Sequence, residues 1–314
     1  MSILVLGSSG LVGRELVHTL AAAGHHVVAC DVTAPVDAEG RAGESITYAR
    51  GDISRLDQMV DLMQRHEISE VACLSYVMGP LMSPDFSDFL LASQINVIGI
   101  TNVLEAARLT GVRRLLLAST VGTYGPQELY GDRPVTEDDL LAPRSMYGRM
   151  KALNEAVADR YAQVHGMEVV KVRPSSILGP GSTIWPSRLI ERLAVGETGL
   201  APYGPQARDN VIAVQDLTAL LTELLTRPAL RHDTYLACGH NVSMAELVAL
   251  LGELLPSGVI DYPANPDRAP SYAQVFDNSR AVSEFDWKLR SVHDSVRLHI
   301  DGVRREAGLG PISW

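Results

Sequence analysis

Cysteine is scarce in this sequence, which has three cysteines among 314 residues. Cys30, Cys73 and Cys238 each lie in or at the end of an apolar run, and their spacing suggests no pairing, so we expect buried free thiols in a reducing compartment. Long hydrophobic runs are also missing. No apolar stretch approaches membrane-spanning length, and the first apolar run lacks the basic segment of a signal peptide, so the sequence predicts a cytoplasmic protein without a membrane segment.

Positive charge is in deficit, with 27 Lys and Arg residues against 37 Asp and Glu residues and a net charge of -10 at pH 7. No lysine- or arginine-rich run offsets this balance, which argues against a nucleic acid or an anionic membrane as a partner. Metal-ligand spacing is lacking as well. His18, His66 and His165 lie on predicted helices without a second ligand, so we predict no metal site.

The chain opens with an apolar run over residues 2–6, followed by three glycines and then a helical pattern. Gly7 permits a sharp turn, Gly10 lets a pyrophosphate approach the backbone, and Gly13 lets the helix pack closely on the strand. The N–H groups of this turn, including those of Leu11 and Val12, would meet the phosphates together with the helix dipole. The stretch therefore predicts a dinucleotide site.

A second short strand, residues 25–30, ends on Asp31 at the distance where a carboxylate accepts from both hydroxyls of an adenosine ribose. No arginine or lysine follows until Arg41, so NAD is favoured over NADP as the cofactor. A solvated residue at the start of a loop is the plainer interpretation of Asp31. Asp52 and Ile53, at the end of the third strand, are predicted to flank the adenine.

Strand and helix patterns alternate through the first half of the chain, which predicts parallel strands covered by helices on both faces. Ligands bind beyond the carboxyl ends of such strands, where we place Leu74 and Ser75 and the irregular segment from Val77 to Pro84. The expected strands are residues 46–52, 71–76 and 113–118, and the expected helices are residues 55–66 and 85–109.

The residues that suggest chemistry follow the fifth strand. Tyr147 and Lys151 lie four apart at the start of a predicted helix and therefore on one helical face, where the lysine ammonium would lower the tyrosine pKa and reach a bound ribose. Thr120 would orient a substrate alcohol while Tyr147 takes its proton. Most Tyr and Lys pairs at this spacing are surface residues, and the glycine turn is what favours a catalytic interpretation here.

Together these motifs resemble the extended short-chain dehydrogenase/reductases, the epimerase/dehydratase-like family. The resemblance rests on Gly7/Gly10/Gly13, on Asp31 and on Tyr147/Lys151, and it extends to about Arg290. It implies a catalytic hydroxyl at Thr120, and it implies cofactor contacts from Asn96, in the long helix, and from Pro174, after the sixth strand. It also implies a homodimer, in which residues 85–109 and 146–165 pair across a twofold axis.

Several positions depart from this family pattern. Dehydratases carry an Asp-Glu pair directly after the catalytic threonine, where this chain has Val121 and Gly122, so dehydration is not expected. Ser176 replaces the asparagine of nucleotide-sugar enzymes, while Arg208 is retained and would contact a diphosphate, although a surface role is equally plausible for it. Family members that act on small hydroxylated metabolites lack the same nucleotide-sugar contacts, and the apolar loop that includes Met78 suits a small or partly hydrophobic substrate.

We therefore predict a Rossmann-like doubly wound α/β sheet with a smaller, mostly C-terminal substrate lobe. Residues 1–174 plus about 208–240 would bind NAD, and about 175–207 plus 241–314 would bind the substrate. The predicted activity is hydride transfer from a secondary alcohol of a small hydroxylated or sugar-like substrate to NAD. A nucleotide-sugar epimerase with tightly held NAD and a non-catalytic NAD-binding regulator remain the alternatives.

Overall fold

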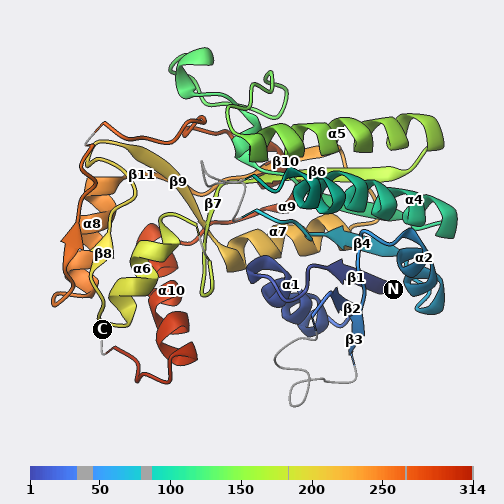
Figure 1. Ribbon diagram of the computed structural model, residues 1–314, viewed down its shortest axis with the longest axis horizontal. Helices are drawn as coiled ribbons and strands as arrows, with labels where there is room; N and C mark the ends of the chain where they lie inside the picture. Colours follow the sequence, from blue (N-terminus) through green and yellow to red (C-terminus); the bar gives the residue numbers. More distant parts are fainter. Residues whose placement is uncertain (34–44, 79–86, 183, 266, 313–314) are drawn as a thin grey trace.

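The large sheet of this protein contains seven parallel strands within the residues that the computed structural model describes, which are 1–33, 45–78, 87–182, 184–265 and 267–312. The order β10-β6-β5-β4-β1-β2-β3 places the switch in strand order between β1 and β4 (Figure 1). These strands are β1 (Ser2–Leu6), β2 (His26–Asp31), β3 (Ile46–Arg50), β4 (Glu70–Cys73), β5 (Arg114–Ala118), β6 (Glu168–Pro174) and β10 (Thr234–Ala237).

Apolar residues on both faces of each central strand explain why helices cover the sheet on both sides. Alternate residues point to opposite faces, so Ile3 and Val5 pack in one core and Leu4 and Leu6 in the other. One face is covered by α1 (Leu11–Ala22), α7 (Val214–Thr226) and α9 (Ser279–Phe285). The other is covered by α2 (Leu56–Arg65), α4 (Ile100–Thr110) and α5 (Met146–His165). The predicted Rossmann-like sheet is confirmed.

The long helix predicted for residues 85–109 begins later and is irregular. It runs as α3 (Phe89–Ser93), a π-helical segment (Gln94–Gly99) and α4, and Asp88 caps its start by accepting from Leu91 N at 3.1 Å. Residues 79–86, which include much of the predicted apolar loop, lie outside the described residues. This 22-residue helix is long and apolar enough to cross a membrane, so the expectation that no such stretch exists was wrong. Its buried face instead packs on the sheet.

Two strands end earlier than the sequence predicts. β3 stops at Arg50 and β4 at Cys73, so Asp52 and Tyr76 follow the strands rather than belong to them. β4 continues its pairing only as far as Leu74 N, which donates to Leu6 O at 3.0 Å. Beyond that point the chain passes close to the β1–α1 turn, at Gly7.

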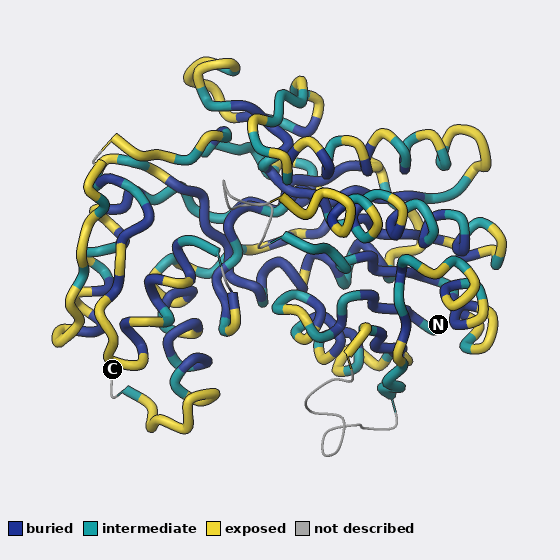
Figure 2. The backbone as a smooth tube through the Cα atoms, viewed as in Figure 1, coloured by how far each residue is buried: buried dark blue, intermediate teal, exposed yellow. Residues whose placement is uncertain are grey.

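The smaller lobe has its own sheets and its own core, shown by the dark blue stretches of its elements in Figure 2. Its three-stranded sheet has the order β11-β9-β7 and its two-stranded sheet pairs β12 with β8. Helices of this lobe bury their apolar faces on these sheets. The elements are β7 (Ser176–Leu178), α6 (Ser187–Ala194), β8 (Gly199–Leu200), β9 (Arg208–Ala213), β11 (His240–Ser243), α8 (Met244–Leu254), β12 (Ile260–Asp261) and α10 (Val292–Glu306).

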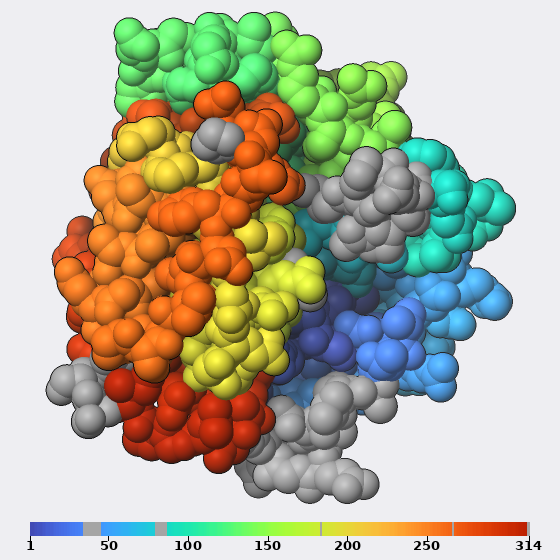
Figure 3. Space-filling view, turned by 60° about the vertical axis from the view of Figure 1, so that its left-hand side comes forward, coloured from blue at the N-terminus to red at the C-terminus, as the bar shows by residue number. Residues whose placement is uncertain are grey.

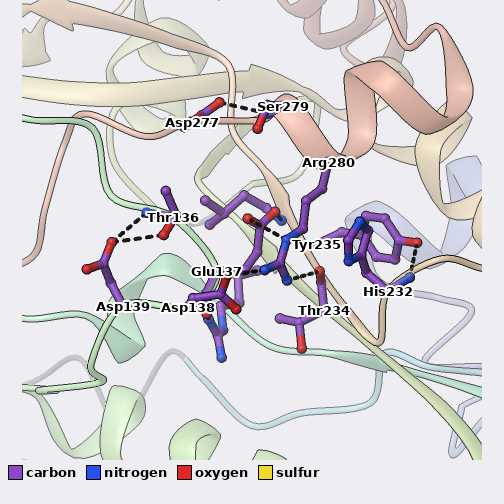
Figure 4. Close-up of polar contacts among 12 residues, drawn as sticks. Thr136, Glu137, Asp138, Asp139, His232, Thr234, Tyr235, Asp277, Ser279 and Arg280 are labelled. Atoms are coloured by element: carbon purple, nitrogen blue, oxygen red, sulfur yellow. Dashed lines mark hydrogen bonds and ion pairs between the residues drawn. The ribbon is translucent and has the colours of Figure 1, made fainter.

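Ion pairs connect α9 to the segment that precedes α5, and hydrogen bonds connect both to the edge strand β10. Arg280, on α9, pairs with Glu137 at 3.5 Å and with Asp138, and it donates to Thr234 O at 3.5 Å (Figure 4). Glu137 in turn accepts from Leu236 N at 2.8 Å. The segment that precedes α5 is thereby held against β10.

The three cysteines are buried and unpaired, as predicted. Cys30 and Cys73 lie in the core beneath α2 and α4, and Cys238 follows β10. Burial raises the pKa of the Cys30 and Cys73 thiols to about 12, so both stay protonated at neutral pH.

Candidate active site

A cavity of about 610 Å³ opens where the large sheet meets the smaller lobe. Its walls come from the β1–α1 loop, the ends of β5 and β6, the start of α5 and the segment 268–272. In Figure 3 the yellow segment that contains α6 stands beside the dark blue N-terminal segment, with a hollow between them. The cavity therefore lies at the carboxyl ends of parallel strands, next to the switch between β1 and β4 where such sheets bind ligands.

The glycines of the β1–α1 loop permit close backbone contacts that side chains would prevent. A Cβ on Gly13 would lie 2.1 Å from Gly7 O, and one on Gly7, whose φ is +84°, would lie 2.8 Å from Ser75 N. Gly10, the N-cap of α1, provides no side chain to accept from the first-turn N–H groups. The start of α1 is therefore open to an anion, which fits the pyrophosphate of a dinucleotide.

Asp31 lies directly beside this loop. Its Oδ2 accepts from Ser9 N at 3.1 Å, and Gly7 N and Ser8 N both donate to the carbonyl of Cys30, the preceding residue. The end of β2 and the glycine loop are thus one rigid unit. This places the carboxylate where it would accept from the hydroxyls of a ribose attached to the pyrophosphate.

The residues predicted from the sequence divide into those that line the cavity and those that do not. The lining includes Gly7, Gly10, Leu11, Val12, Gly13, Leu74, Met78, Thr120, Tyr147, Lys151, Pro174 and Ser176. Outside the lining lie Asp31, Asp52, Ile53, Ser75, Asn96 and Arg208. The contacts of this second group show how each can act.

Asn96 reaches the cavity only through the backbone of another residue. Its amide accepts from Val77 N at 2.8 Å and donates to Val77 O at 2.9 Å, which fixes the segment that carries Met78. Asp52 accepts from Ser54 N at 2.9 Å, and Ile53 packs close to Gly99 at the start of α4. None of the three lines the cavity, and the contacts of Asp52 and Ile53 with adenine stay a prediction.

Arg208 is not brought to the cavity. Its guanidinium donates to Asn241 Oδ1 at 3.0 Å and to Asn241 O at 2.9 Å, and it pairs with Glu246 at 3.2 Å. The arginine that lines the cavity is Arg268, which lies in an exposed segment and was not singled out by the sequence.

Thr120, Tyr147 and Lys151 come together in the cavity because α5 packs directly on the turn after β5. Thr120 caps the 3₁₀ turn Val121–Thr123 by accepting from Gly122 N at 3.1 Å. A Cβ on Gly148 would lie 2.1 Å from Gly122 O, so only glycine permits this approach. The close packing places Tyr147 beside Thr120, and the threonine hydroxyl acts to lower the pKa of the tyrosine.

Electrostatics at the site differ from the sequence-based expectation. Burial raises the pKa of Tyr147 to about 12, and the hydrogen bond with Thr120 opposes this only in part. Burial also lowers the pKa of Lys151 to about 8. The lysine Nζ donates to Ala118 O at 2.6 Å and lies 3.8 Å from the centre of the Tyr76 ring, so it does not pair with the Tyr147 hydroxyl. The expected lowering of the tyrosine pKa by the ammonium was wrong for this state, because desolvation outweighs it.

Tyr76 is a cavity residue that the sequence did not reveal. Its ring stands edge-on to Tyr147 with the centroids 5.5 Å apart, and its buried hydroxyl has no hydrogen-bond partner among the described residues. A buried hydroxyl without a partner is costly, so this group is available to a ligand. The tyrosine follows β4 in a segment with no motif, and no local signal could have identified it.

A buried ion pair supports the catalytic helix from behind. Arg173 donates to Glu155 at 3.0 and 2.6 Å and to Tyr124 OH at 2.5 Å, and Ser119 donates to the same glutamate. Glu155 lies one turn beyond Lys151 on α5, while Ser119 precedes Thr120. The pair therefore connects α5, β6 and the end of β5 behind the site.

Asp209 is a second residue that the sequence analysis missed. It is 2% exposed, and it accepts from Tyr272 OH at 3.0 Å and from Ser176 Oγ at 3.1 and 3.2 Å. Ser176 and Tyr272 line the cavity, so the carboxyl lies directly behind its wall. Burial raises the pKa of Asp209 to about 7.

The contribution of Asp209 to stability is expected to fall as pH rises. Its carboxyl pKa is 3.8 when exposed and about 7 when folded, so in this interval only the folded chain holds the proton. The stabilisation is complete below the lower value and is lost as pH rises through the upper one. Urea unfolding of wild-type protein and Asp209→Asn across this interval should show a flatter pH dependence for the variant. Parallel curves would contradict the assignment.

A parallel sheet with a glycine-rich first loop and a tyrosine–lysine pair at its carboxyl edge is the arrangement of a dinucleotide-dependent oxidoreductase. Residues 3–238 match the NAD dependent epimerase/dehydratase family. The chain belongs to this family, within the extended short-chain dehydrogenase/reductases. The prediction of an NAD-dependent enzyme of this type is confirmed.

Proteins similar to this chain carry the names of different enzymes. A UDP-glucose 4-epimerase of Vibrio cholerae is 28% identical over 293 residues, covering 92% of this chain and 86% of its own length. The mitochondrial L-threonine 3-dehydrogenase of Bos taurus is 25% identical over 209 residues, covering 63% of this chain and 55% of its own. The solved structure of MoeE5 in complex with UDP-glucuronic acid and NAD is 28% identical with a TM-score of 0.83, covering 98% of this chain and 100% of that chain.

Proposed function

We propose that this enzyme removes hydride from a secondary alcohol of a small hydroxylated or sugar-like substrate and leaves a ketone. The observation that carries the proposal is that Thr120, Tyr147 and Lys151 line one cavity, with Lys151 one helical turn from Tyr147 on α5. When bound, NAD supplies the carbon that accepts the hydride. The glycine loop and Asp31 would hold this cofactor.

Each side chain has a distinct task in the proposed reaction. The Tyr147 phenolic oxygen takes the alcohol proton, and the Thr120 hydroxyl orients the alcohol by hydrogen bonding. Lys151 is a cation of the site, and its ammonium would hold the ribose of the bound cofactor. Its lowered pKa of about 8 means that this charge weakens above that pH.

Residues around the reacting groups support simple oxidation. Val121 and Gly122 follow Thr120 and offer no acid or base for elimination. Arg208 is engaged by Asn241 and Glu246 and does not reach the cavity, which supports a substrate without a diphosphate at that position. The alternative is an epimerase, in which the same hydride returns to the other face, and it is favoured by the likeness to UDP-glucose 4-epimerase.

Absorbance of the reduced cofactor distinguishes these functions. The enzyme is incubated with NAD and a panel of small hydroxy acids, small polyols and nucleotide sugars. A dehydrogenase accumulates reduced cofactor with a substrate from the panel, whereas an epimerase converts a sugar without accumulating it. Binding of NAD without conversion of any panel member would favour the third candidate, a non-catalytic NAD-binding regulator.

NAD is expected to bind at least about tenfold more tightly than NADP, roughly 1.4 kcal/mol, because the Asp31 carboxylate would face the additional phosphate of NADP. Calorimetric titration with each nucleotide measures the difference. Asp31→Ala should narrow it, while Asp61→Ala, which removes an exposed carboxylate on α2, should not. Equal affinities of the wild-type protein for the two nucleotides would refute the assignment.

We further propose a homodimer formed by the long helices. Large apolar side chains are exposed there, including Leu90 at 71%, Ile98 at 54% and Leu153 at 48%. Light scattering at micromolar concentration is expected to give twice the chain mass for the wild-type protein, and Leu153→Glu should shift it toward the monomer. Leu140→Glu, at an 80% exposed position outside these helices, is the matched control. A monomeric wild-type protein would contradict the proposal.

We also propose that one lobe binds the cofactor and the other binds the substrate. Residues 1–174 plus about 208–240 would hold the cofactor, and about 175–207 plus 241–314 would hold the substrate. Within the second stretch of the cofactor part, α7 and β10 pack with the large sheet, whereas β9 pairs with β7 and β11. Three unpaired cysteines and a net charge of -10 support a cytoplasmic enzyme of small molecules, without a nucleic-acid or membrane partner.

A further inference from the structure

The wall that the smaller lobe contributes to the cavity contains a connected polar group, here called the carboxyl wall and made of Ser176, Asp209 and Tyr272. Ser176 begins β7 and Asp209 lies on the adjacent strand β9, while Tyr272 comes from the segment that leads toward α9. The two hydroxyl oxygens are 3.2 Å apart, and each lies within 3.2 Å of the carboxyl. Ser176 and Tyr272 face the cavity, and Asp209 is behind them.

The hydrogen-bond directions at this wall follow from the ionised carboxylate, which can only accept. Asp209 accepts from both hydroxyls and from Asn210 N at 2.8 Å. A hydroxyl that donates its proton to Asp209 has only lone pairs left to offer to the cavity. The ionised wall therefore accepts hydrogen bonds, and it suits a ligand that carries donors.

The charge of Asp209 is not neutralised nearby. No lysine, arginine or histidine of the described residues forms an ion pair with it, and Arg208, its neighbour on β9, is engaged by Asn241 and Glu246. The titratable groups that face it are the phenols of Tyr272 and Tyr203, and the Arg268 guanidinium acts on Tyr203. An anionic ligand group at this wall would be repelled, and an ammonium group would be attracted.

We propose that the carboxyl wall binds a hydroxyl or ammonium group of the substrate, so that the enzyme selects neutral or cationic donor-bearing secondary alcohols over anionic ones. Ser176 and Tyr272 are the contact residues, and Asp209 is a positioning residue that acts through their hydroxyls. The inference rests on the proposed oxidation for its reacting carbon, but its selectivity concerns binding alone.

Three-carbon alcohols with the same secondary carbon and different charge test the wall. The probes are 1-amino-2-propanol, propane-1,2-diol and lactate, titrated into the enzyme loaded with reduced cofactor while the cofactor fluorescence is followed. At about pH 8 the amino alcohol is expected to bind at least roughly tenfold more tightly than lactate, with the diol between them. The preference should shrink at about pH 6, where Asp209 is protonated.

Variants separate the wall from the rest of the site. Asp209→Asn and Tyr272→Phe should each reduce the preference for the amino alcohol by several-fold while the affinity for NAD is unchanged. Asp261→Asn, the same substitution on an exposed carboxylate of the smaller lobe, should leave the preference intact. Tyr272→Phe retains the Asp209 carboxyl. If Asp209→Asn does not fold, the Tyr272 variant still tests whether the carboxyl wall sets the preference for the amino alcohol.

The two proposals fail in different ways. Equal binding of the three probes, tighter binding of lactate, no binding of the amino alcohol and diol, or an unchanged preference in both variants overturns the carboxyl wall. Selective binding of the probes without reduction of NAD by any of them supports the wall and counts against the proposed oxidation. Steady-state rates complete the distinction, since loss of the wall should raise KM and leave kcat nearly unchanged.

Discussion

Tyr147→Phe is expected to lower turnover by roughly 10² or more, the usual range for the loss of a general base. The substitution removes only the phenolic oxygen, which is the atom that takes the substrate proton in the proposed reaction. Affinity for NAD should change little, because the ring remains in place against Tyr76. Reduced-cofactor absorbance measures turnover, and calorimetry measures cofactor binding.

Neighbouring substitutions distinguish the roles within the site. Lys151→Met should reduce both turnover and NAD affinity, because the ammonium also reaches the ribose. Thr120→Ser should retain most activity and Thr120→Val should not, since the hydroxyl alone orients the substrate. A Tyr147→Phe enzyme with near-normal turnover would remove the catalytic assignment and leave only the cofactor site.

The pH dependence of turnover should report the same tyrosine. Only the phenolate accepts a proton, so the rate should rise with pH toward the raised pKa of about 12. The Lys151 ammonium, whose pKa is about 8, opposes this rise by losing its charge above that pH. In Tyr147→Phe the residual rate should lose the rising limb.

Arg173→Met is expected to reduce the free energy of unfolding by about 3–5 kcal/mol, the range for breaking a buried ion pair from one side. Arg173 is 5% exposed and Glu155 is 2% exposed, so the substitution leaves a buried carboxylate with only Ser119 to hydrogen-bond it. Reversible urea unfolding measures the loss.

Two further variants test whether the loss of stability comes from the buried ion pair. The control is an exposed ion pair between Glu223, on α7, and Arg227, directly after it. Arg227→Met should lower the free energy of unfolding by less than about 1 kcal/mol. The double variant Arg173→Met with Glu155→Leu should recover much of the loss, because it removes the stranded charge as well. A single Arg173 variant as stable as the control would show that the pair contributes little.

Much of the cofactor half was predictable because its signals are local. A continuous apolar run of strand length specifies a strand buried on both faces, and Gly7, Gly10 and Gly13 specify a turn within seven residues. The pairing of Tyr147 with Lys151 requires only helical spacing. Each of these patterns lies within a short stretch of the chain. The sequence therefore determined the Rossmann sheet and the edge at which the ligand is predicted to bind.

The substrate half was decided by contacts between distant parts of the chain. Tyr272 meets Asp209 across 63 residues, and Ser176 meets the same carboxyl across 33, through the pairing of β7 with β9. Arg208 carried a family motif, yet its neighbours on β11 and α8 turn it away from the cavity. No local pattern records which side chains a second sheet will bring together.

Protonation also depended on packing. The sequence predicts a lowered pKa for Tyr147 because a lysine is four residues away, but the structure raises it, since burial removes water from both groups and Lys151 is held by Ala118 and Tyr76. The sequence by itself determined the fold class, the cofactor loop and the identity of the candidate catalytic residues. The tertiary structure alone decided their electrostatics and the wall opposite them, because desolvation and long-range hydrogen bonds exist only once the chain has closed around the cavity.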